Sequence, residues 1–166
     1  MAVENKYVNT SIAAGTFADS TYNSQTKTII QTFEVAAADD DGSIYRLARI
    51  NSNEILLKAT IMCDAITGGT DYDLGIYKPT TVAGSGAVVD KDIFMDGQTF
   101  ASATKTIDGL QTVDIANRTL NVVDLLNIVN TTTLANSNQE YDIALTANTV
   151  GTAAGTVTVI LEIVRV

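Results

Sequence analysis

The sequence predicts an all-β protein: an antiparallel β-sandwich or jelly-roll-like domain with one short helix and an irregular N-terminal arm. Three observations lead to this prediction. β-Branched residues dominate the periodic stretches of the 166-residue chain, and such residues favour strands. Several stretches alternate polar and apolar residues with period two, and clusters of Gly, Asn and Asp separate them. Short strands divided by such turns are typical of sandwiches and jelly rolls.

The clearest strand is predicted at ILLKATIMC, where alternation places one set of side chains on one face: Ile55, Leu57, Ala59, Ile61 and Cys63. Lys58 and Thr60 fall on the opposite face, as in a half-buried strand. In DYDLGIY the same reasoning points Tyr72, Leu74 and Ile76 inward and Asp71, Asp73, Gly75 and Tyr77 outward. Further strands are predicted at 27–37, 43–50, 141–147 and 155–166.

Turns are predicted where Gly, Asn and Asp gather, because these residues supply positive φ angles and local hydrogen bonds. The predicted turns lie at 39–43, 51–54, 66–71, 83–87 and 149–156. One segment, NRTLNVVDLLNIV (117–129), instead spaces its apolar residues as a helix does. We predict one short helix there, with Asn117 as its N-cap.

The length suits one domain that buries roughly 70% of its unfolded surface. We predict a single β-sandwich domain at 26–166, preceded by an arm at 1–25 whose small, polar residues show no clear period. No run approaches the roughly 18–20 apolar residues of a membrane span. The first residues, MAVENKYVNT, lack the basic start and apolar run of a secretory signal. The expectation is a soluble chain made in a cytoplasm.

The composition excludes several classes of chemistry. The chain has no His, one Cys and no Trp, so imidazole catalysis, His-ligated metals, intramolecular disulfides and Cys clusters are absent. Cys63, on the apolar face of its strand, is expected to be a small buried hydrophobe. The net charge is −9, and the ten Lys and Arg residues are spread thinly along the chain. The sequence therefore has no basic stripe that would bind nucleic acid or an anionic membrane. We expect no enzyme activity and no cofactor.

Three groups of carboxylates are candidate sites. Asp71 and Asp73 would be neighbours on one strand face, whereas inverting glycosidases hold their carboxyls about 6.5–9.5 Å apart across a cleft, so a solvated surface is favoured. The Asp run at 39–41 departs from the alternating ligands of a calcium loop and predicts a hairpin turn, with a weak Ca²⁺ site left open. Asp90, Asp92 and Asp96 are expected in a loop, and their spacing matches no known pattern of metal ligands. We expect no metal site.

Several stretches resemble a known family. They are MAVENKYVNTSIAAG, FEVAAADDDGSIYRLARI (33–50), DAITGGTDYDLGIY (64–77), VVDKDIFMDG (88–97) and YDIALTANTVGTAAGTVTV (141–159). Together they resemble the head decoration, or cement, proteins of tailed bacteriophages, while 118–138 matches least. The resemblance implies a virion protein, made in the host cytoplasm, on the outer surface of the icosahedral head. Such proteins bind after shell expansion and bridge neighbouring major capsid subunits.

The implied partners are the major capsid protein and further copies of this chain, as a trimer first and a dimer second. On this hypothesis the arm lies on the capsid or on a neighbouring copy, with Lys6, Tyr7 and Tyr22 as candidate anchoring residues. The alternative is a carbohydrate-binding β-sandwich of the receptor-binding or adhesin type, which needs exposed aromatic platforms. A glycoside hydrolase using Asp71 and Asp73 is a distant third.

Overall fold

The computed structural model describes residues 5–7, 26–80, 86–131, 133–134 and 138–165. For 5–7 and 104–105 it describes the backbone alone. The described residues form nine strands, one 3-10 turn and one α-helix. In chain order these elements are β1 (Asn5–Tyr7), β2 (Thr26–Val35), β3 (Ser43–Asn51), β4 (Glu54–Cys63), β5 (Asp71–Tyr77), β6 (Val88–Gln98), β7 (Thr104–Asp108), η1 (Ile115–Asn117), α2 (Val122–Val129), β8 (Glu140–Thr149) and β9 (Gly155–Arg165).

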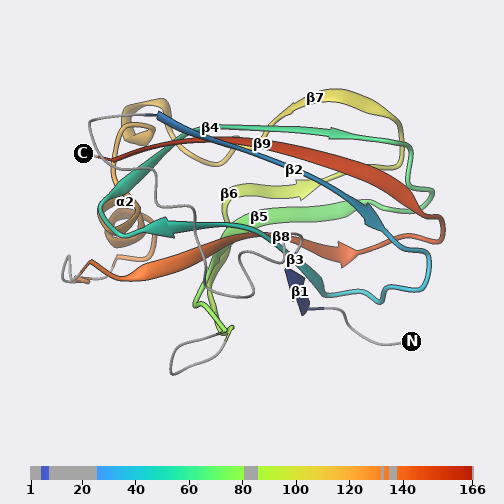
Figure 1. Cartoon of the computed structure of the whole chain (residues 1–166), viewed down its shortest axis with the longest axis horizontal. Coiled ribbons are helices and arrows are strands. Elements are labelled where there is room, and N and C mark those ends of the chain that lie inside the picture. Colours follow the sequence, from blue (N-terminus) through green and yellow to red (C-terminus); the bar gives the residue numbers. More distant parts are fainter. Residues whose placement is uncertain (1–4, 8–25, 81–85, 132, 135–137, 166) are drawn as a thin grey trace.

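The strands form two facing sheets (Figure 1). One sheet has the order β1-β3-β8-β5-β6 and the other β2-β9-β4-β7. The pairing is nested, because β2 pairs with β9, β3 with β8, β4 with β7 and β5 with β6, each antiparallel. A chain paired in this way is one long antiparallel hairpin rolled into two sheets, which is the jelly-roll arrangement. The predicted all-β sandwich with one short helix is confirmed.

The core lies between the two sheets and is mostly aliphatic, with a few stacked aromatic rings. Strand β9 alternates as predicted, with Val157, Val159, Leu161 and Ile163 almost completely buried. Phe33 stacks on Tyr45 with ring centroids 5.0 Å apart, and Tyr72 stacks on Phe100 at 4.1 Å. Offset or stacked aromatic pairs add to the free energy of burial. Tyr72 and Tyr141 are core residues, as expected, and Cys63 is buried beside the carbonyl oxygen of Ser102.

The predicted face of β4 is wrong at one position. Leu56 is buried, whereas Leu57 is 40% exposed. The pairing of β4 with β9 shifts by one residue between Leu56 and Lys58, which is a β-bulge. An extra residue in one strand exchanges the faces of the residues on either side of it, so strict alternation fails there.

The predicted helix begins too early. Asn117 ends the 3-10 turn η1, which is capped by Asp114. The helix α2 begins at Val122, and the side chain of Asn121 accepts a hydrogen bond from the Asp124 amide at 2.9 Å. Asn121 has an extended backbone, with ψ of 166°, so no helix runs through it. Among the described residues no helix is long and apolar enough to cross a membrane.

Two further expectations need correction. The Asp run at 39–41 lies between β2 and β3, which belong to different sheets, so it turns a corner and does not close a hairpin. Asp90, Asp92 and Asp96 lie within strand β6, not in a loop.

The arm expected to be irregular contains β1, which pairs in parallel with β3 from Asn5–Ile44 to Tyr7–Arg46. The rest of the arm, including Tyr22, lies outside the described residues.

Candidate interaction surfaces

The outer face of the five-stranded sheet, turned away from the core, carries a buried ion-pair cluster. Asp142 lies on β8 and is fully buried, between two arginines of β3. Its carboxylate accepts hydrogen bonds from Arg46 and Arg49, each at 3.0 Å. Arg49 also reaches Glu140 at 3.3 Å. Because opposite charges pair within it, burial of this cluster is tolerated, and it links β8 to β3.

Arg46 also binds the two ends of the connection between β5 and β6, at Lys78 and Gly86. Its guanidinium donates to the carbonyl oxygens of Lys78 at 3.1 Å and Gly86 at 2.9 Å. It lies 5.3 Å from the centre of the Tyr77 ring, a cation–π distance. Tyr77 is on the outer face as predicted but is buried, and its hydroxyl hydrogen-bonds with Thr146. Burial raises the pKa of Tyr77, against opposing effects of Thr146, Lys91 and Arg46.

Asp73 is buried, so its predicted solvated position is wrong. Its side chain is 1% exposed, and it lies 3.2 Å from the Lys91 ammonium. It also accepts from the Gly97 amide at 2.9 Å and from the Asn148 amide at 2.6 Å. Asp71, half-buried, accepts from the same Asn148 nitrogen at 3.1 Å. Two carboxylates that share one amide donor lie closer together than the roughly 6.5–9.5 Å of an inverting glycosidase pair, and the Asn148 side chain occupies the space between them.

The other acidic groups brace corners of the fold. Asp39 accepts from the Tyr45 hydroxyl at 2.6 Å and Asp41 from the Val150 amide at 2.9 Å. Burial and a hydrogen bond to Asp92 raise the pKa of Asp90. Within the described part of the chain no three carboxylates or thiols gather as a metal site would require.

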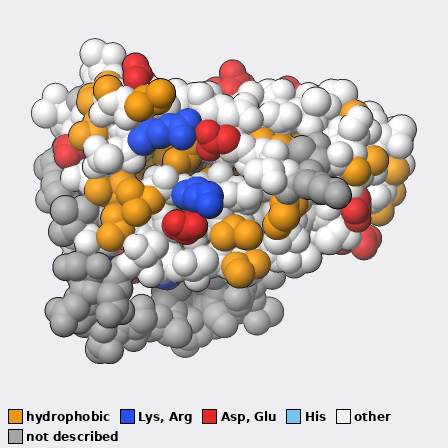
Figure 2. All heavy atoms as spheres, turned by 90° about the horizontal axis from the view of Figure 1, so that it is seen from above, with side chains coloured by type: hydrophobic (Ala, Val, Ile, Leu, Met, Phe, Trp, Pro, Cys, Tyr) orange, Lys and Arg blue, Asp and Glu red, His pale blue; other side chains and the backbone are white. Residues whose placement is uncertain are grey.

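The outer face of the four-stranded sheet is open (Figure 2). Apolar side chains lie scattered on it among polar atoms, and charged groups of opposite sign lie next to one another, as Lys58 and Glu162 do. Ile30 on β2 is 63% exposed and pairs in register with Ile160 on β9. The hydroxyls of Thr32 and Thr158 hydrogen-bond at 2.9 Å. Among the described residues of this face, no polar groups converge as they do in the site of a small ligand.

One end of the sandwich, next to α2, exposes aliphatic side chains. Ile128 and Val129 at the end of the helix are at least half exposed, as is Ile115 in η1, and Leu134 is 41% exposed. Asn127 fixes Leu134 by two backbone hydrogen bonds, at 2.6 Å and 3.2 Å. Sequence reasoning did not identify this end as a surface, although the apolar residues in the last turn of the helix were a signal for it.

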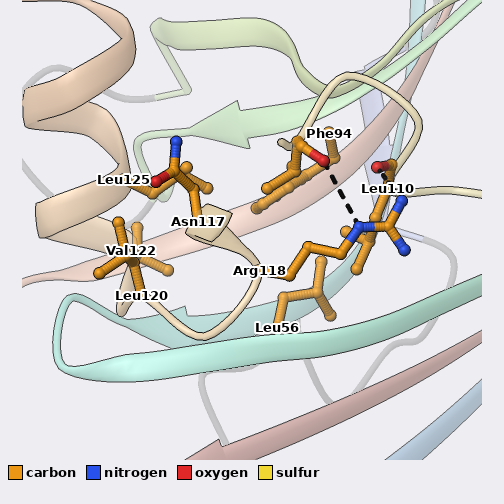
Figure 3. Close-up of a pocket in the computed structure, with 9 residues that line it drawn as sticks. Leu56, Phe94, Leu110, Asn117, Arg118, Leu120, Val122 and Leu125 are labelled. Atoms are coloured by element: carbon orange, nitrogen blue, oxygen red, sulfur yellow. Dashed lines mark hydrogen bonds between the residues drawn. The ribbon is translucent and has the colours of Figure 1, made fainter. Parts of the chain in front are cut away.

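The cavity beside α2 is too small for a ligand (Figure 3). Its volume is about 10 Å³, room for about one water molecule. Leu56, Phe94 and Leu125 are among its lining residues, and Arg118 closes it by donating to the carbonyls of Val113 and Leu110. Every Tyr and Phe whose side chain is described is buried or half-buried.

These features define an eight-stranded jelly roll, extended by β1, with buried ion pairs on one outer face and a water-sized cavity beside α2. A chain in the capsid of Ralstonia phage GP4 is similar, with a TM-score of 0.55 and 14% identity over 90% of this chain and 89% of that one. A chain of the cyanophage Pam1 capsid asymmetric unit aligns with a TM-score of 0.42 and 16% identity over 85% of each. At these identities the first likeness shows a shared fold, and nothing further rests on the second. No protein-family model and no curated protein matches the chain.

Proposed function

We propose that this chain is a structural virion protein that binds the outer surface of the expanded phage capsid and stabilises it by bridging major capsid subunits. The observation that carries the proposal is the jelly roll shared along most of the chain with a chain of the Ralstonia phage GP4 capsid. The resemblance of several sequence stretches to decoration proteins supports the outer surface as the proposed place. The protein acts by binding and has no enzymatic step.

The architecture suits this role. The nested strand pairing and the buried ion pairs of Asp142 make a rigid unit. A net charge of −9 favours solubility at high copy number. Each contact with the shell can be weak, because a bridging oligomer binds at several points at once. We place a homotrimer at local threefold positions first and a dimer at twofold positions second.

The N-terminal arm is the proposed contact element, with Lys6, Tyr7 and Tyr22 as anchoring candidates. Residues 5–7 pair with the edge of β3, so the arm starts from the side of the five-stranded sheet. The major capsid protein is the proposed partner of the arm residues on either side of this short strand. The carbohydrate-binding alternative loses support, because every described tyrosine and phenylalanine side chain is at least half-buried and offers no sugar platform.

Co-sedimentation with undecorated heads of the parent phage tests this function. Expanded heads and compact procapsids are incubated separately with purified protein, and the bound amount is measured against concentration. We expect saturable binding to expanded heads alone, with a stoichiometry that distinguishes threefold from twofold sites. Absence of binding to both forms would overturn the proposal, and a glycan array would then test the alternative.

A further inference from the structure

Three side chains from neighbouring strands meet on the outer face of the five-stranded sheet. Asp73 lies on β5, between Lys91 on β6 and Asn148 on β8. Gly75 lets β6 lie this close to β5, because a Cβ there would be 2.2 Å from the Asp90 carbonyl oxygen and from the Lys91 carbonyl carbon. The close approach of the two backbones brings the Lys91 side chain over Asp73.

The atoms of this cluster are arranged as the parts of an amide-exchange reaction. The Lys91 Nζ lies 2.9 Å from the Asn148 Oδ1, so an amine adjoins a carboxamide. One oxygen of Asp73, Oδ2, lies 3.2 Å from the Lys91 Nζ and 2.6 Å from the Asn148 Nδ2. The same carboxylate oxygen therefore contacts both the nucleophilic nitrogen and the nitrogen that would leave. A general acid–base group must lie within hydrogen-bond reach of the protons it moves.

Asn148 is held in one orientation for this chemistry. Its Nδ2 donates to carboxylate oxygens of both Asp71, at 3.1 Å, and Asp73, while its Oδ1 accepts from Lys91. A flipped amide would point its oxygen at two carboxylates and its nitrogen at an ammonium group. Fixed orientation of both reactants replaces a bimolecular encounter by an intramolecular one, which accelerates such reactions strongly.

We propose that Lys91 and Asn148 form an intramolecular isopeptide bond, with Asp73 as the proton carrier. Asp73 first takes a proton from the Lys91 ammonium. The neutral Nζ attacks the Asn148 Cγ, and the carbonyl electron pair moves to Oδ1. Asp73 donates its proton to Nδ2, the C–N bond to Nδ2 breaks as the carbonyl re-forms, and the second Nζ proton passes to the departing ammonia. The products are one secondary amide, one ammonium ion and the Asp73 carboxylate, without any oxidant or cofactor.

The charges around Lys91 predict how the reaction depends on pH. Burial alone would lower the pKa of Lys91, but the hydrogen bond and charge of Asp73, with Asp92 and Asp71, raise it above its ordinary value. The amine is therefore mostly protonated at neutral pH. Because Asp73 takes the Lys91 proton directly and keeps it for Nδ2, no proton is released to solvent before the attack, so the rate of bond formation changes little with pH below that pKa. The bond would tie β6 to β8 across β5 and lock the centre of this sheet.

Intact-protein mass spectrometry tests the proposal. The purified wild type is incubated at about pH 7 and pH 9, and its mass is compared with the sequence mass. We expect a species lighter by one ammonia, formed at similar rates at the two pH values, and a cross-linked peptide containing Lys91 and Asn148 after proteolysis. A wild type that stays at the sequence mass under both conditions would overturn the proposal.

Two variants separate this bond from other losses of ammonia. Lys91→Arg keeps the ion pair with Asp73 but has no amine of comparable reactivity, so it should stay at the sequence mass. The same loss in Lys91→Arg would mean that an asparagine elsewhere cyclises, and the proposal would fall. Asp73→Asn should slow bond formation by at least about a hundredfold. An unchanged rate in a folded Asp73→Asn variant would contradict the role of Asp73 as proton carrier.

Discussion

At the scale of single residues, the outer face of the five-stranded sheet depends on Asp142. This carboxylate compensates the buried charge of Arg46 and contacts Arg49 as well. Asp142→Ala leaves a fully buried guanidinium without its carboxylate, so we expect the free energy of unfolding to fall by about 3–5 kcal/mol. Urea denaturation followed by circular dichroism measures the loss.

A matched control is available on the opposite sheet. Glu162 pairs with Lys58 at 3.6 Å, where the side chains are 35% and 60% exposed. Glu162→Ala should cost about 0–1 kcal/mol, because solvent screens an exposed pair. Equal losses in Asp142→Ala and Glu162→Ala would show that the Asp142 cluster contributes no special stability.

Buried tyrosines predict a loss of stability in alkali. Burial, then the charges of Cys63, Asp39 and Asp41, raises the pKa of Tyr72, and burial raises that of Tyr141. Above about pH 10 the unfolded chain releases tyrosine protons that the folded chain retains, so the unfolding free energy falls as pH rises. The slope is at most about 1.4 kcal/mol per pH unit for each such tyrosine.

Tyr72→Phe tests this effect. The variant loses the hydrogen bond to the Val150 carbonyl, which lowers stability at all pH values, but it also removes one titrating group. We expect the decline of the unfolding free energy between about pH 9 and pH 11 to become shallower than in the wild type. A parallel decline in the two proteins would refute a titrating role for Tyr72. Urea titrations at fixed pH values provide the comparison.

At the scale of elements, the beginning of α2 distinguishes two asparagines. Asn121 caps the helix through the Asp124 amide, so Asn121→Ala should lower the unfolding free energy by about 1 kcal/mol. Asn117, at the end of η1, makes no such cap. Asn117→Ala should therefore change stability by less than about 0.5 kcal/mol. Thermal unfolding of both variants decides, and a larger cost at Asn117 would contradict the helix boundary.

The elements also show what the sequence could and could not predict. Alternation is a local property, so β8, β9 and the inward set of β5 were predictable from residue order alone. The bulge that exposes Leu57 arises from pairing with β9, and the burial of Asp73 arises from Lys91, Gly97 and Asn148 on other strands. Partners distant in sequence decide both features, and no local pattern contains them.

The same reason applies to the cluster of Lys91, Asn148 and Asp73. Each residue alone fits a polar position on a strand, so the local sequence pattern does not mark any of them as part of a site. Only the strand order β8-β5-β6 brings the three together. The helix boundary was missed for a different reason, since Asn117 and Asn121 are both good caps and the choice between them depends on how Arg118 packs.

At the scale of the whole molecule, the jelly roll and the arm should be separable. Deletion of residues 1–22 removes the three-residue strand β1 but none of the eight strands that begin at Thr26. We expect the shortened protein to unfold cooperatively with a modest loss of stability, and to lose binding to expanded heads. Denaturation and co-sedimentation measure the two effects. A deletion variant that binds normally would refute the role of the arm.

Point variants refine that result within the full-length chain. Lys6→Ala, Tyr7→Ala and Tyr22→Ala each remove one anchoring candidate and leave the arm in place. If these residues contact the shell, the combined variant should bind at least about tenfold more weakly, since a few large side chains usually dominate an interface. Unchanged binding of the combined variant would assign the contact to other parts of the arm.

The position of the protein on the virion is the most direct test of the account. Cryo-electron microscopy of the parent phage head, with and without this protein, would locate its jelly roll. The account predicts additional density of this fold on the outer surface of expanded heads, in contact with more than one major capsid subunit and centred on local threefold positions. Density on the tail, inside the shell or on a single subunit without bridging would contradict it.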